Sequence, residues 1–425
     1  MAALAQAAAH AAQPRPAYEA APALRTVPRI SVQAFVETVA TFEAIEEAGR
    51  DRRMVKAQVR VQNGGIKAAC AHYSSSPTPN LIIIESALDP DPLLAELDGL
   101  AQHCDPGSKV LVVGRHNDVR LYRELMQRGI SEYLVAPVGL VDILEPIARI
   151  FVDDEAEPLG RTLAFIGAKG GVGSSTIAHN VAWSVAKLFS AEVVLCDLDL
   201  PFGTANINFD QDPPQGIAEA LHSADRVDEV LLDRLLVRCA EHLSLLAAPS
   251  VLDRTYDFHA DAFATLIEAA QRSTPVVVLD VPHLWNEWTR SVLRQADEVV
   301  VTAIPDLANL RNAKNFVDTL KALRPNDPPP RIVLNQVGAP KRPEIPAAEF
   351  LDALGLEAVA TIGFDPQLFG TAANNGQMIA EADPKHAVNE SMRELAHLVT
   401  GRSSAKRGKR TGAAALLDLV RRKRA

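Results

Sequence analysis

This sequence has few of the features that mark secreted, membrane-spanning or metal-cluster proteins. It contains only four cysteines in 425 residues (Cys70, Cys104, Cys196 and Cys239), and none has CxxC or Cys/His metal-ligand spacing. No apolar run reaches the roughly 20 residues of a membrane span, and the N-terminus lacks the basic start and apolar core of a signal peptide. These absences predict a soluble cytoplasmic protein whose thiols stay reduced.

Positive charge is scarce except near the end of the chain. The formal net charge is −10. Residues 402–425 carry nine Lys/Arg against one Asp, a net +8, so residues 1–401 carry −18. DNA phosphates are held by Lys and Arg, so an acidic body argues against wrapping DNA. The hydrophobic share of 48% suffices for large cores, and the length fits two or three domains.

Composition divides the chain into five segments. Residues 1–28 are rich in Ala and Pro and are predicted to be disordered. Residues 29–150 have globular composition, 151–160 form a short acidic linker, and 161–401 are again globular. Residues 402–425 are a basic tail whose last part, rich in Ala and Leu, predicts a short amphipathic helix. A basic amphipathic helix is typical of a membrane surface, and a solvated tail that contacts an acidic partner is the alternative.

The first globular segment alternates buried strands with helices. Residues 81–84, 110–113 and 132–135 are apolar runs typical of parallel strands, and 119–127 have helical character. This order predicts an α/β sheet.

The same segment resembles the receiver domains of response regulators, which implies a flavodoxin-like fold. In that family an Asp ends the third strand, a Thr or Ser ends the fourth, and a Lys precedes a Pro after the fifth. This chain has Glu85, Gly114 and Ala136 at those places, and no acidic pair follows the strand at 30–35. Phosphotransfer needs the metal and the lysine to offset developing charge. The resemblance therefore implies a pseudo-receiver that binds a partner or a second copy, and disfavours a phosphorelay regulator. An α/β domain unrelated to receivers is the alternative.

A glycine-rich stretch at residues 165–176 organises the second segment. It lies between an apolar strand and a helix, where backbone N–H groups can surround phosphate oxygens. The strict P-loop pattern G-x-x-x-x-G-K-[ST] fails at two positions, Ala168 and Ser174, and a lysine stands early, at Lys169. A Gly-rich surface turn is the alternative.

Acidic residues follow two further apolar strands. The strand at 192–197 is followed by Asp199, with Asp197 at its end, and the strand at 275–279 is followed by Asp280 and then His283. Catalytic groups of open α/β sheets lie at such carboxyl ends, and carboxylates there can hold Mg²⁺ through water. Acids that merely cap strand ends are the alternative, and His283 is expected to be an exposed loop histidine.

Together these residues resemble the ParA/MinD ATPases with their deviant Walker A loop, over about residues 162–390. Ser174 in an otherwise intact loop is similar to the TadZ/CpaE pilus-assembly branch. The resemblance implies an α/β P-loop domain with a mostly parallel sheet, ATP and Mg²⁺ as ligands, and Lys169, Asp199 and Asp280 as catalytic residues. Ser175, Asp199 and Asp280 would hold Mg²⁺. The implied nucleotide-binding residues are Lys169, Gly170, Gly171, Val172, Gly173, Ser174, Ser175, Thr176, Asn335, Asp365 and Pro366.

The function that the resemblance implies is a slow ATPase switch. It would form a homodimer on ATP and position a Tad/Flp-type pilus or related secretion system at a cell pole or the inner membrane. Its partners would be a pilus or secretion ATPase or polar landmark proteins. A non-hydrolysing nucleotide-binding scaffold, favoured by Ser174, and a DNA-partition ATPase, disfavoured by the acidic body, are the alternatives.

Overall fold

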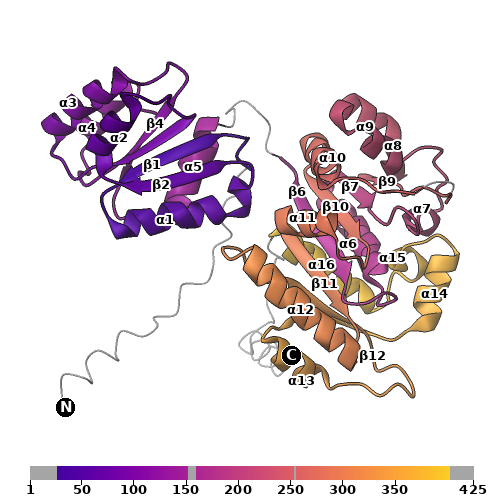
Figure 1. Cartoon of the computed structure of the whole chain (residues 1–425). Helices are drawn as coiled ribbons and strands as arrows, with labels where there is room; N and C mark the ends of the chain where they lie inside the picture. Colours follow the sequence, from indigo (N-terminus) through magenta and orange to yellow (C-terminus); the bar gives the residue numbers. More distant parts are fainter. Residues whose placement is uncertain (1–25, 152–158, 253–254, 403–425) are drawn as a thin grey trace, which may run out of the picture.

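The computed structural model describes residues 26–151, 159–252 and 255–402, which form two α/β bodies (Figure 1). The predictions made for residues 1–25 and 403–425 lie outside the described residues. Within these ranges no helix is both long and apolar enough to cross a membrane.

The first body is a five-stranded parallel sheet with strand order β2-β1-β3-β4-β5, which confirms the flavodoxin-like prediction. Helices α1 and α5 cover one face, and α2, α3 and α4 cover the other. The central strand β3 is buried at every residue, as its run of Leu and Ile predicts. The elements are β1 (Ser31–Val36), α1 (Val39–Arg50), η1 (Arg52–Met54), β2 (Gln58–Asn63), α2 (Gly65–Tyr73), β3 (Leu81–Glu85), α3 (Pro90–Ala101), β4 (Lys109–Gly114), α4 (Val119–Gln127), β5 (Glu132–Val135) and α5 (Leu140–Phe151).

The second body is an eight-stranded sheet with strand order β13-β12-β11-β6-β10-β7-β9-β8. All neighbouring pairs are parallel except β8 with β9, which confirms the predicted mostly parallel sheet. The elements up to β9 are β6 (Arg161–Gly167), α6 (Ser174–Phe189), β7 (Val193–Asp197), α7 (Ala205–Asn208), α8 (Ile217–His222), η2 (Ala224–Arg226), α9 (Glu229–Leu235), β8 (Val237–Ala240) and β9 (Leu243–Leu246). The later elements are α10 (Ala260–Ser273), β10 (Val276–Val281), α11 (Glu287–Gln295), β11 (Glu298–Ala303), α12 (Leu307–Leu323), β12 (Arg331–Val337), α13 (Ala347–Leu354), β13 (Ala358–Gly363), α14 (Pro366–Asn374), α15 (Ile379–Ala382) and α16 (Val388–Thr400).

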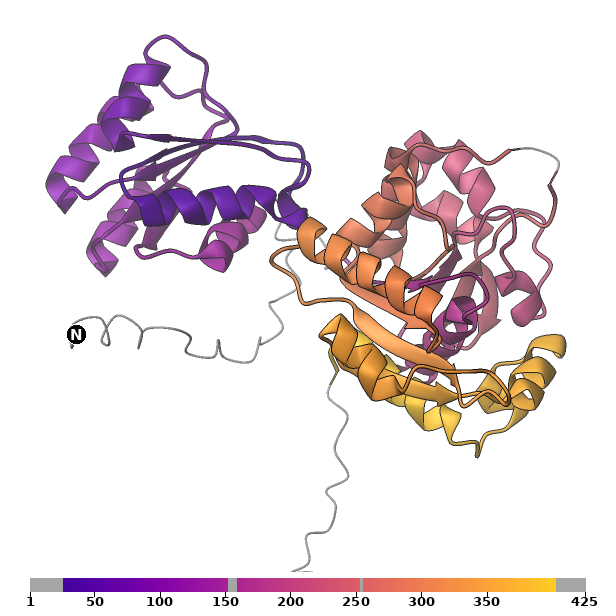
Figure 2. The ribbon, with the colours of Figure 1, turned by 60° about the horizontal axis from the view of Figure 1, so that its bottom comes forward.

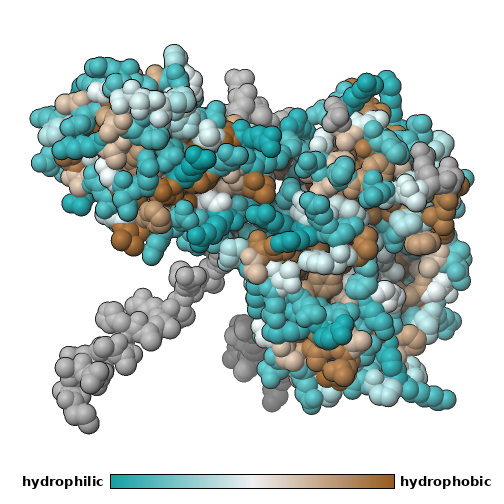
Figure 3. Space-filling view, viewed as in Figure 1, coloured by the Kyte–Doolittle hydropathy of each residue, from teal (hydrophilic) through white to brown (hydrophobic). Residues whose placement is uncertain are grey.

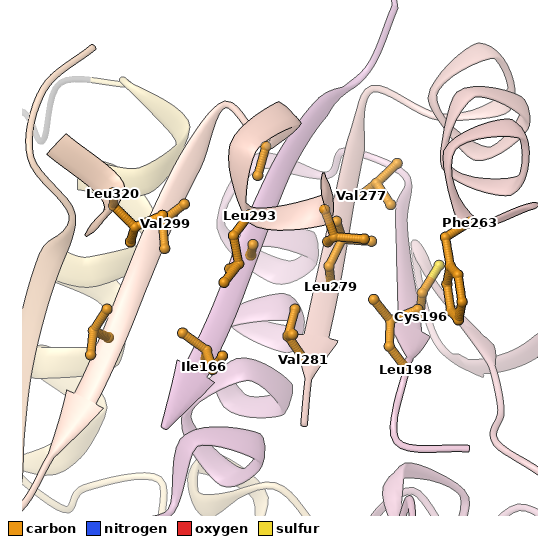
Figure 4. Close-up of a cluster of buried hydrophobic side chains, with 14 of the residues drawn as sticks. Ile166, Cys196, Leu198, Phe263, Val277, Leu279, Val281, Leu293, Val299 and Leu320 are labelled. Atoms are coloured by element: carbon orange, nitrogen blue, oxygen red, sulfur yellow. The ribbon is translucent and has the colours of Figure 1, made fainter. Parts of the chain in front are cut away.

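Apolar side chains pack on both faces of this sheet. Helices α10, α11 and α12 cover one face, and α6 and α16 cover the other. Figure 4 shows the first of these layers, in which Ile166, Leu279 and Val299 of three neighbouring strands point toward Leu293 and Leu320 of the helices. The central strands are therefore covered on both sides, and their carboxyl ends are held at one edge.

Two edge strands were not predicted from the sequence. Strand β2 alternates exposed and half-buried residues, and β8 has no buried residue. Each lies at the end of its sheet, where one face or one side meets solvent, so neither has the continuous apolar run of a central strand.

The two bodies meet through polar contacts. Arg52 of η1 donates from Nε to Asp327 Oδ2 (2.8 Å) and from Nη2 to Asp297 Oδ1 (3.0 Å), and from Nη1 to the carbonyl of Gln295 (2.8 Å). Asn326 donates to Asp51 across the same interface. Figure 2 shows the end of α12 beside the N-terminal body. Elsewhere the face in Figure 3 is mostly hydrophilic, with scattered hydrophobic patches.

Candidate functional site

The loop between β6 and α6 has the backbone of a phosphate cradle. Gly171 and Gly173 adopt positive φ angles of 80° and 86°, a conformation that glycine takes without a Cβ penalty. A Cβ added at Gly173 would also lie 2.5 Å from Asn335 Nδ2. The glycines therefore let the chain turn sharply into the first turn of α6.

Side chains from three other parts of the domain hold the carbonyl groups of residues in this loop. Each of these side chains donates an N–H hydrogen bond to one backbone carbonyl. The carbonyl oxygens therefore point toward these side chains and away from the cradle. The four contacts are His283 Nδ1 to Gly167 O (2.9 Å), Asn312 Nδ2 to Ala168 O (2.9 Å), Gln336 Nε2 to Gly171 O (3.1 Å) and Asn335 Nδ2 to Val172 O (2.8 Å).

Polar groups without partners face the same loop. Among the described residues, nothing accepts a hydrogen bond from the backbone N–H groups of Lys169, Gly170, Gly171 or Gly173. The buried Ser174 hydroxyl likewise has no partner within the described part of the chain. The first N–H groups of α6 are also free by helix geometry, and the helix dipole adds positive potential there. This donor set fits the oxygens of a phosphate group.

Two carboxylates lie side by side beneath the cradle. Asp197 of β7 and Asp280 of β10 are register partners on neighbouring parallel strands, and both are buried. Asp197 accepts hydrogen bonds from the N–H groups of Asp199 and Ala205. Burial and the nearby Asp280 charge raise the pKa of Asp197 to about 7. Asp197 therefore organises the backbone of residues 198–205 and does not point to solvent.

Asp199 is the more accessible acid of this edge. Burial raises its pKa, a hydrogen bond from Phe202 opposes that shift, and the Asp280 charge adds to it. The structure thus places Asp199 close enough to Asp280 for the Asp280 charge to raise the Asp199 pKa, and a shared role of the two in Mg²⁺ binding stays a prediction. Within the described residues no group of three His, Cys, Asp or Glu side chains could hold a metal ion by itself. The hydroxyl of Ser175 and these two carboxylates fit Mg²⁺, which commonly takes one or two carboxylates and completes its shell with phosphate oxygens and water.

Lys169 is exposed at the rim of the cradle. Its charge acts on Asp306, the N-cap of α12: burial raises the pKa of Asp306, but hydrogen bonds from Asn309 and the Lys169 charge leave it lowered. The Lys169 charge thus acts on Asp306 of its own chain, and contact of Lys169 with a second copy stays a prediction.

The residues predicted to surround the base have partners of their own. Asn335 is buried, and its amide holds Val172 O, so in this structure it supports the loop. Asp365 caps α14 by accepting from Leu368 N (3.0 Å), and Pro366 is the exposed first residue of that helix. Contact of these three residues with adenine stays a prediction.

Sequence reasoning missed His179, Asn208, Asn312 and Gln336. His179 Nε2 lies 3.2 Å from Asp280 Oδ2, and its Nδ1 lies 3.1 Å from Asn208 Nδ2. One signal was available, because His179 follows Ser175 by four residues, which puts both on one face of α6. His283 is exposed, as expected, and donates to the loop.

The receiver-like positions in the first body are occupied by structural groups. Glu85 accepts hydrogen bonds from the backbone N–H groups of Glu37 and Thr38 and from the hydroxyls of Thr38 and Thr41. A Cβ at Gly114 would lie 2.3 Å from the Tyr133 hydroxyl oxygen, which donates to His116 O. The carboxylate is saturated and the neighbouring space is filled, which favours a structural role for these residues, and the absence of phosphoacceptor chemistry stays a prediction.

Comparisons with known proteins find similar proteins for each of the two domains. Residues 160–329 match the AAA_31 family, described as an AAA domain. The N-terminal part is similar to the pilus assembly protein CpaE of Caulobacter crescentus CB15, whose solved structure is 45% identical over 30% of this chain and 98% of that chain, with a TM-score of 0.30. A ParA family ATPase from Chlorobium tepidum TLS is 24% identical over 56% of this chain and 98% of that chain (TM-score 0.51) and shares the fold. The septum site-determining protein MinD of Bacillus subtilis (strain 168) is 22% identical over 259 residues, 58% of this chain and 91% of that protein.

Proposed function

Because this chain is a ParA/MinD-type ATPase of the CpaE pilus-assembly kind, with a receiver-like domain in front, we propose that it is an ATP- and Mg²⁺-dependent switch. It positions a Tad/Flp-type pilus or a related secretion system. The 45% sequence identity to a pilus assembly protein supports the cellular role, and the cradle supports nucleotide binding.

The observation that carries nucleotide binding is the arrangement of the loop at residues 168–173. Side chains hold the carbonyl groups of Ala168, Gly171 and Val172, and His283 holds that of the preceding Gly167. The N–H groups of residues 169–171 and 173 and the Ser174 hydroxyl lack partners within the described residues. The backbone of residues 170–173 binds the phosphates. Ser175 and Asp280 bind Mg²⁺, partly through water, and Asp199 orders the attacking water. Bound Mg²⁺ would neutralise charge that develops on the phosphates.

Dimerisation on ATP is the second part of the proposal. Large apolar side chains are exposed on segments that border the site: Phe202 (71%), Leu284 (48%), Trp285 (47%) and Leu307 (74%). Burying them against a second copy would be favourable by roughly 25 cal/mol per Å², and Lys169 would then reach the partner's phosphates. The dimer would bind a pilus or secretion ATPase or polar landmark proteins at the inner membrane or the cell pole.

The test combines binding and assembly. Titration calorimetry measures ATP affinity with Mg²⁺ and with EDTA, and light scattering after gel filtration measures mass with each nucleotide. We expect Mg²⁺-dependent ATP binding and a doubled mass with ATP. A monomer that binds no nucleotide would refute the switch. Loss of polar foci of a tagged protein in cells that lack the pilus genes checks the cellular role.

A non-hydrolysing scaffold is the second candidate, favoured by Ser174 at the usual lysine position. Such a scaffold binds ATP and dimerises, and a steady-state turnover assay gives no phosphate release above that of an Asp280→Asn variant. The DNA-partition alternative is disfavoured by the −18 charge of residues 1–401, and a salt-titrated DNA-binding assay tests it.

A further inference from the structure

His179 is a histidine in the interior of the second domain. It lies on α6, the helix that follows the cradle, and its side chain is 1% exposed. Its Nδ1 is 3.1 Å from the Asn208 amide nitrogen, so Asn208 donates to it, and the proton of the neutral ring lies on Nε2. Nε2 then donates to Asp280 Oδ2 at 3.2 Å. The ring thus uses both nitrogens, one toward each of two different elements.

These contacts join the three segments that surround the cradle. Helix α6 carries Ser175 one turn before His179, β10 carries Asp280, and α7 carries Asn208 directly after the segment that holds Asp199. No other side chain in the described part of the chain bonds to both β10 and α7. His179 is therefore a side-chain link between Asp280 and α7, in addition to the backbone hydrogen bond from Leu198 N to Asp280 O (3.0 Å).

The negative charge of the site makes the hydrogen bond between His179 and Asp280 more important. Asp197 and Asp280 are buried next to each other, and among the described residues no Lys or Arg forms an ion pair with either. Ser174 stands where the strict P-loop pattern has a lysine. The hydrogen bond from His179 is thus the side-chain interaction that fixes the Asp280 carboxylate in the absence of a nearby cation.

We propose that His179 is a positioning residue for the metal–nucleotide site: it orients Asp280 and couples that carboxylate, through Asn208, to residues 199–208. This inference rests on the proposed function, since it concerns how the site binds Mg²⁺ and nucleotide. Hydrogen-bonding partners of metal-binding carboxylates typically change metal affinity or activity 10–100-fold when removed. A buried histidine that merely fills space would not act on Mg²⁺-dependent binding.

Two variants separate the contacts of the ring. The amide of His179→Gln reaches about as far as Nε2 and keeps a donor for Asp280. The shorter amide of His179→Asn lies near the place of Nδ1 and keeps the contact to Asn208 but not the one to Asp280. His397→Ala is the matched control, because His397 packs against Phe189 at the opposite end of α6.

The experiment measures ATP affinity of the full-length chain by fluorescence of a labelled ATP analogue, with Mg²⁺ and with EDTA. We expect His179→Asn to weaken Mg²⁺-dependent binding about 10–100-fold, with affinity in EDTA unchanged, and His179→Gln to retain most of the wild-type value. Hydrogen exchange of residues 199–208 should slow on addition of Mg-ATP in the wild type and in neither His179 variant, because each variant lacks one of the two contacts that couple Asp280 to Asn208. His397→Ala should behave as the wild type in both measurements.

The outcomes distinguish this inference from the proposed function. If the wild type binds no nucleotide, the proposed function falls and the inference falls with it. If the wild type binds Mg-ATP but both His179 variants keep its Mg²⁺ dependence, the positioning role is wrong and the switch stands. Asn208→Ala removes the half-buried partner without opening the core. It should abolish the slowing at 199–208 even if the His179 variants fold poorly, and unchanged slowing would overturn the coupling.

Discussion

Arg52 and Asp327 form an ion pair of 2.8 Å between the two domains, with side chains only 13% and 9% exposed. Asp327 also pairs with Arg324, and the second acid bound by Arg52, Asp297, accepts from Thr162 at the start of β6. The N-terminal domain is thus fixed to the amino ends of the strands, on the edge opposite the nucleotide loop. These contacts give the N-terminal domain a defined orientation relative to the second domain.

Arg52→Ala should release this contact. Removing the guanidinium takes one hydrogen-bonding partner from each of two partly buried carboxylates, Asp297 and Asp327, which costs about 1–3 kcal/mol. We expect small-angle scattering to give a larger radius of gyration. Arg50→Ala is the control, since Arg50 is 72% exposed and, among the described residues, forms an ion pair only with Glu46 of the same helix. Equal radii for both variants would contradict the interface.

Turnover of ATP should be slow and should depend on Lys169. Ser174 supplies no cation to the phosphates, so in the proposed dimer the exposed Lys169 of the second copy would be the source of that charge. Lys169→Ala should lower steady-state phosphate release at least about tenfold. Lys187→Ala, on the exposed side of α6, should leave it unchanged. Fast hydrolysis that survives Lys169→Ala would refute this account.

Glu85 should stabilise the N-terminal domain in a pH-dependent way. Burial raises its pKa, but hydrogen bonds from Thr38, Thr41 and Glu37 outweigh burial and lower it from 4.5. A lowered folded-state pKa means that the stabilisation is present above the unfolded-state value and is lost as pH falls through the folded-state value.

Glu85→Gln should therefore lower the free energy of unfolding by about 1–3 kcal/mol at pH 7, and the difference from wild type should shrink below pH 4.5. Hydrogen exchange of α1 amides in a urea series measures this, with Glu46→Gln on the same helix as control. A difference that is the same at pH 7 and below pH 4 would show that charge is not involved.

The N-terminal domain should not accept a phosphoryl group. The carboxylate of Glu85 is saturated with four donors, and Tyr133 fills the space beside Gly114. Intact-mass spectrometry after treatment with acetyl phosphate should detect no phosphoryl adduct. A stable adduct that maps to this domain would overturn the pseudo-receiver assignment.

The basic tail should bind anionic membranes weakly. Residues 402–425 carry a net +8, and each basic residue near an anionic leaflet contributes about 1 kcal/mol. Full-length protein should sediment with anionic liposomes, less so at high salt, and more with ATP because a dimer has two tails. A 1–401 truncation should not sediment. Equal binding by both proteins, or by neither, would exclude a membrane role for the tail.

Central strands and the glycine loop could be predicted because their signals are local. The all-apolar run of β3 and the apolar run of β10 ending in Asp280 reflect burial on both faces of a parallel sheet. Edge strands β2 and β8 were missed because partial exposure removes that signal. The acids at the ends of β7 and β10 lie on neighbouring strands of the structure, because carboxyl ends of parallel strands share one edge.

The sequence by itself determined the two α/β domains and the glycine-rich loop between a strand and a helix, because these depend on residue types at fixed local spacing. Only the tertiary structure decided how the side chains are used. Asn335 and Val172 are 163 residues apart, and Arg52 and Asp327 are 275 apart. Such hydrogen bonds depend on how distant elements pack, so no local pattern shows that Asn335 supports the loop or that Arg52 joins the domains.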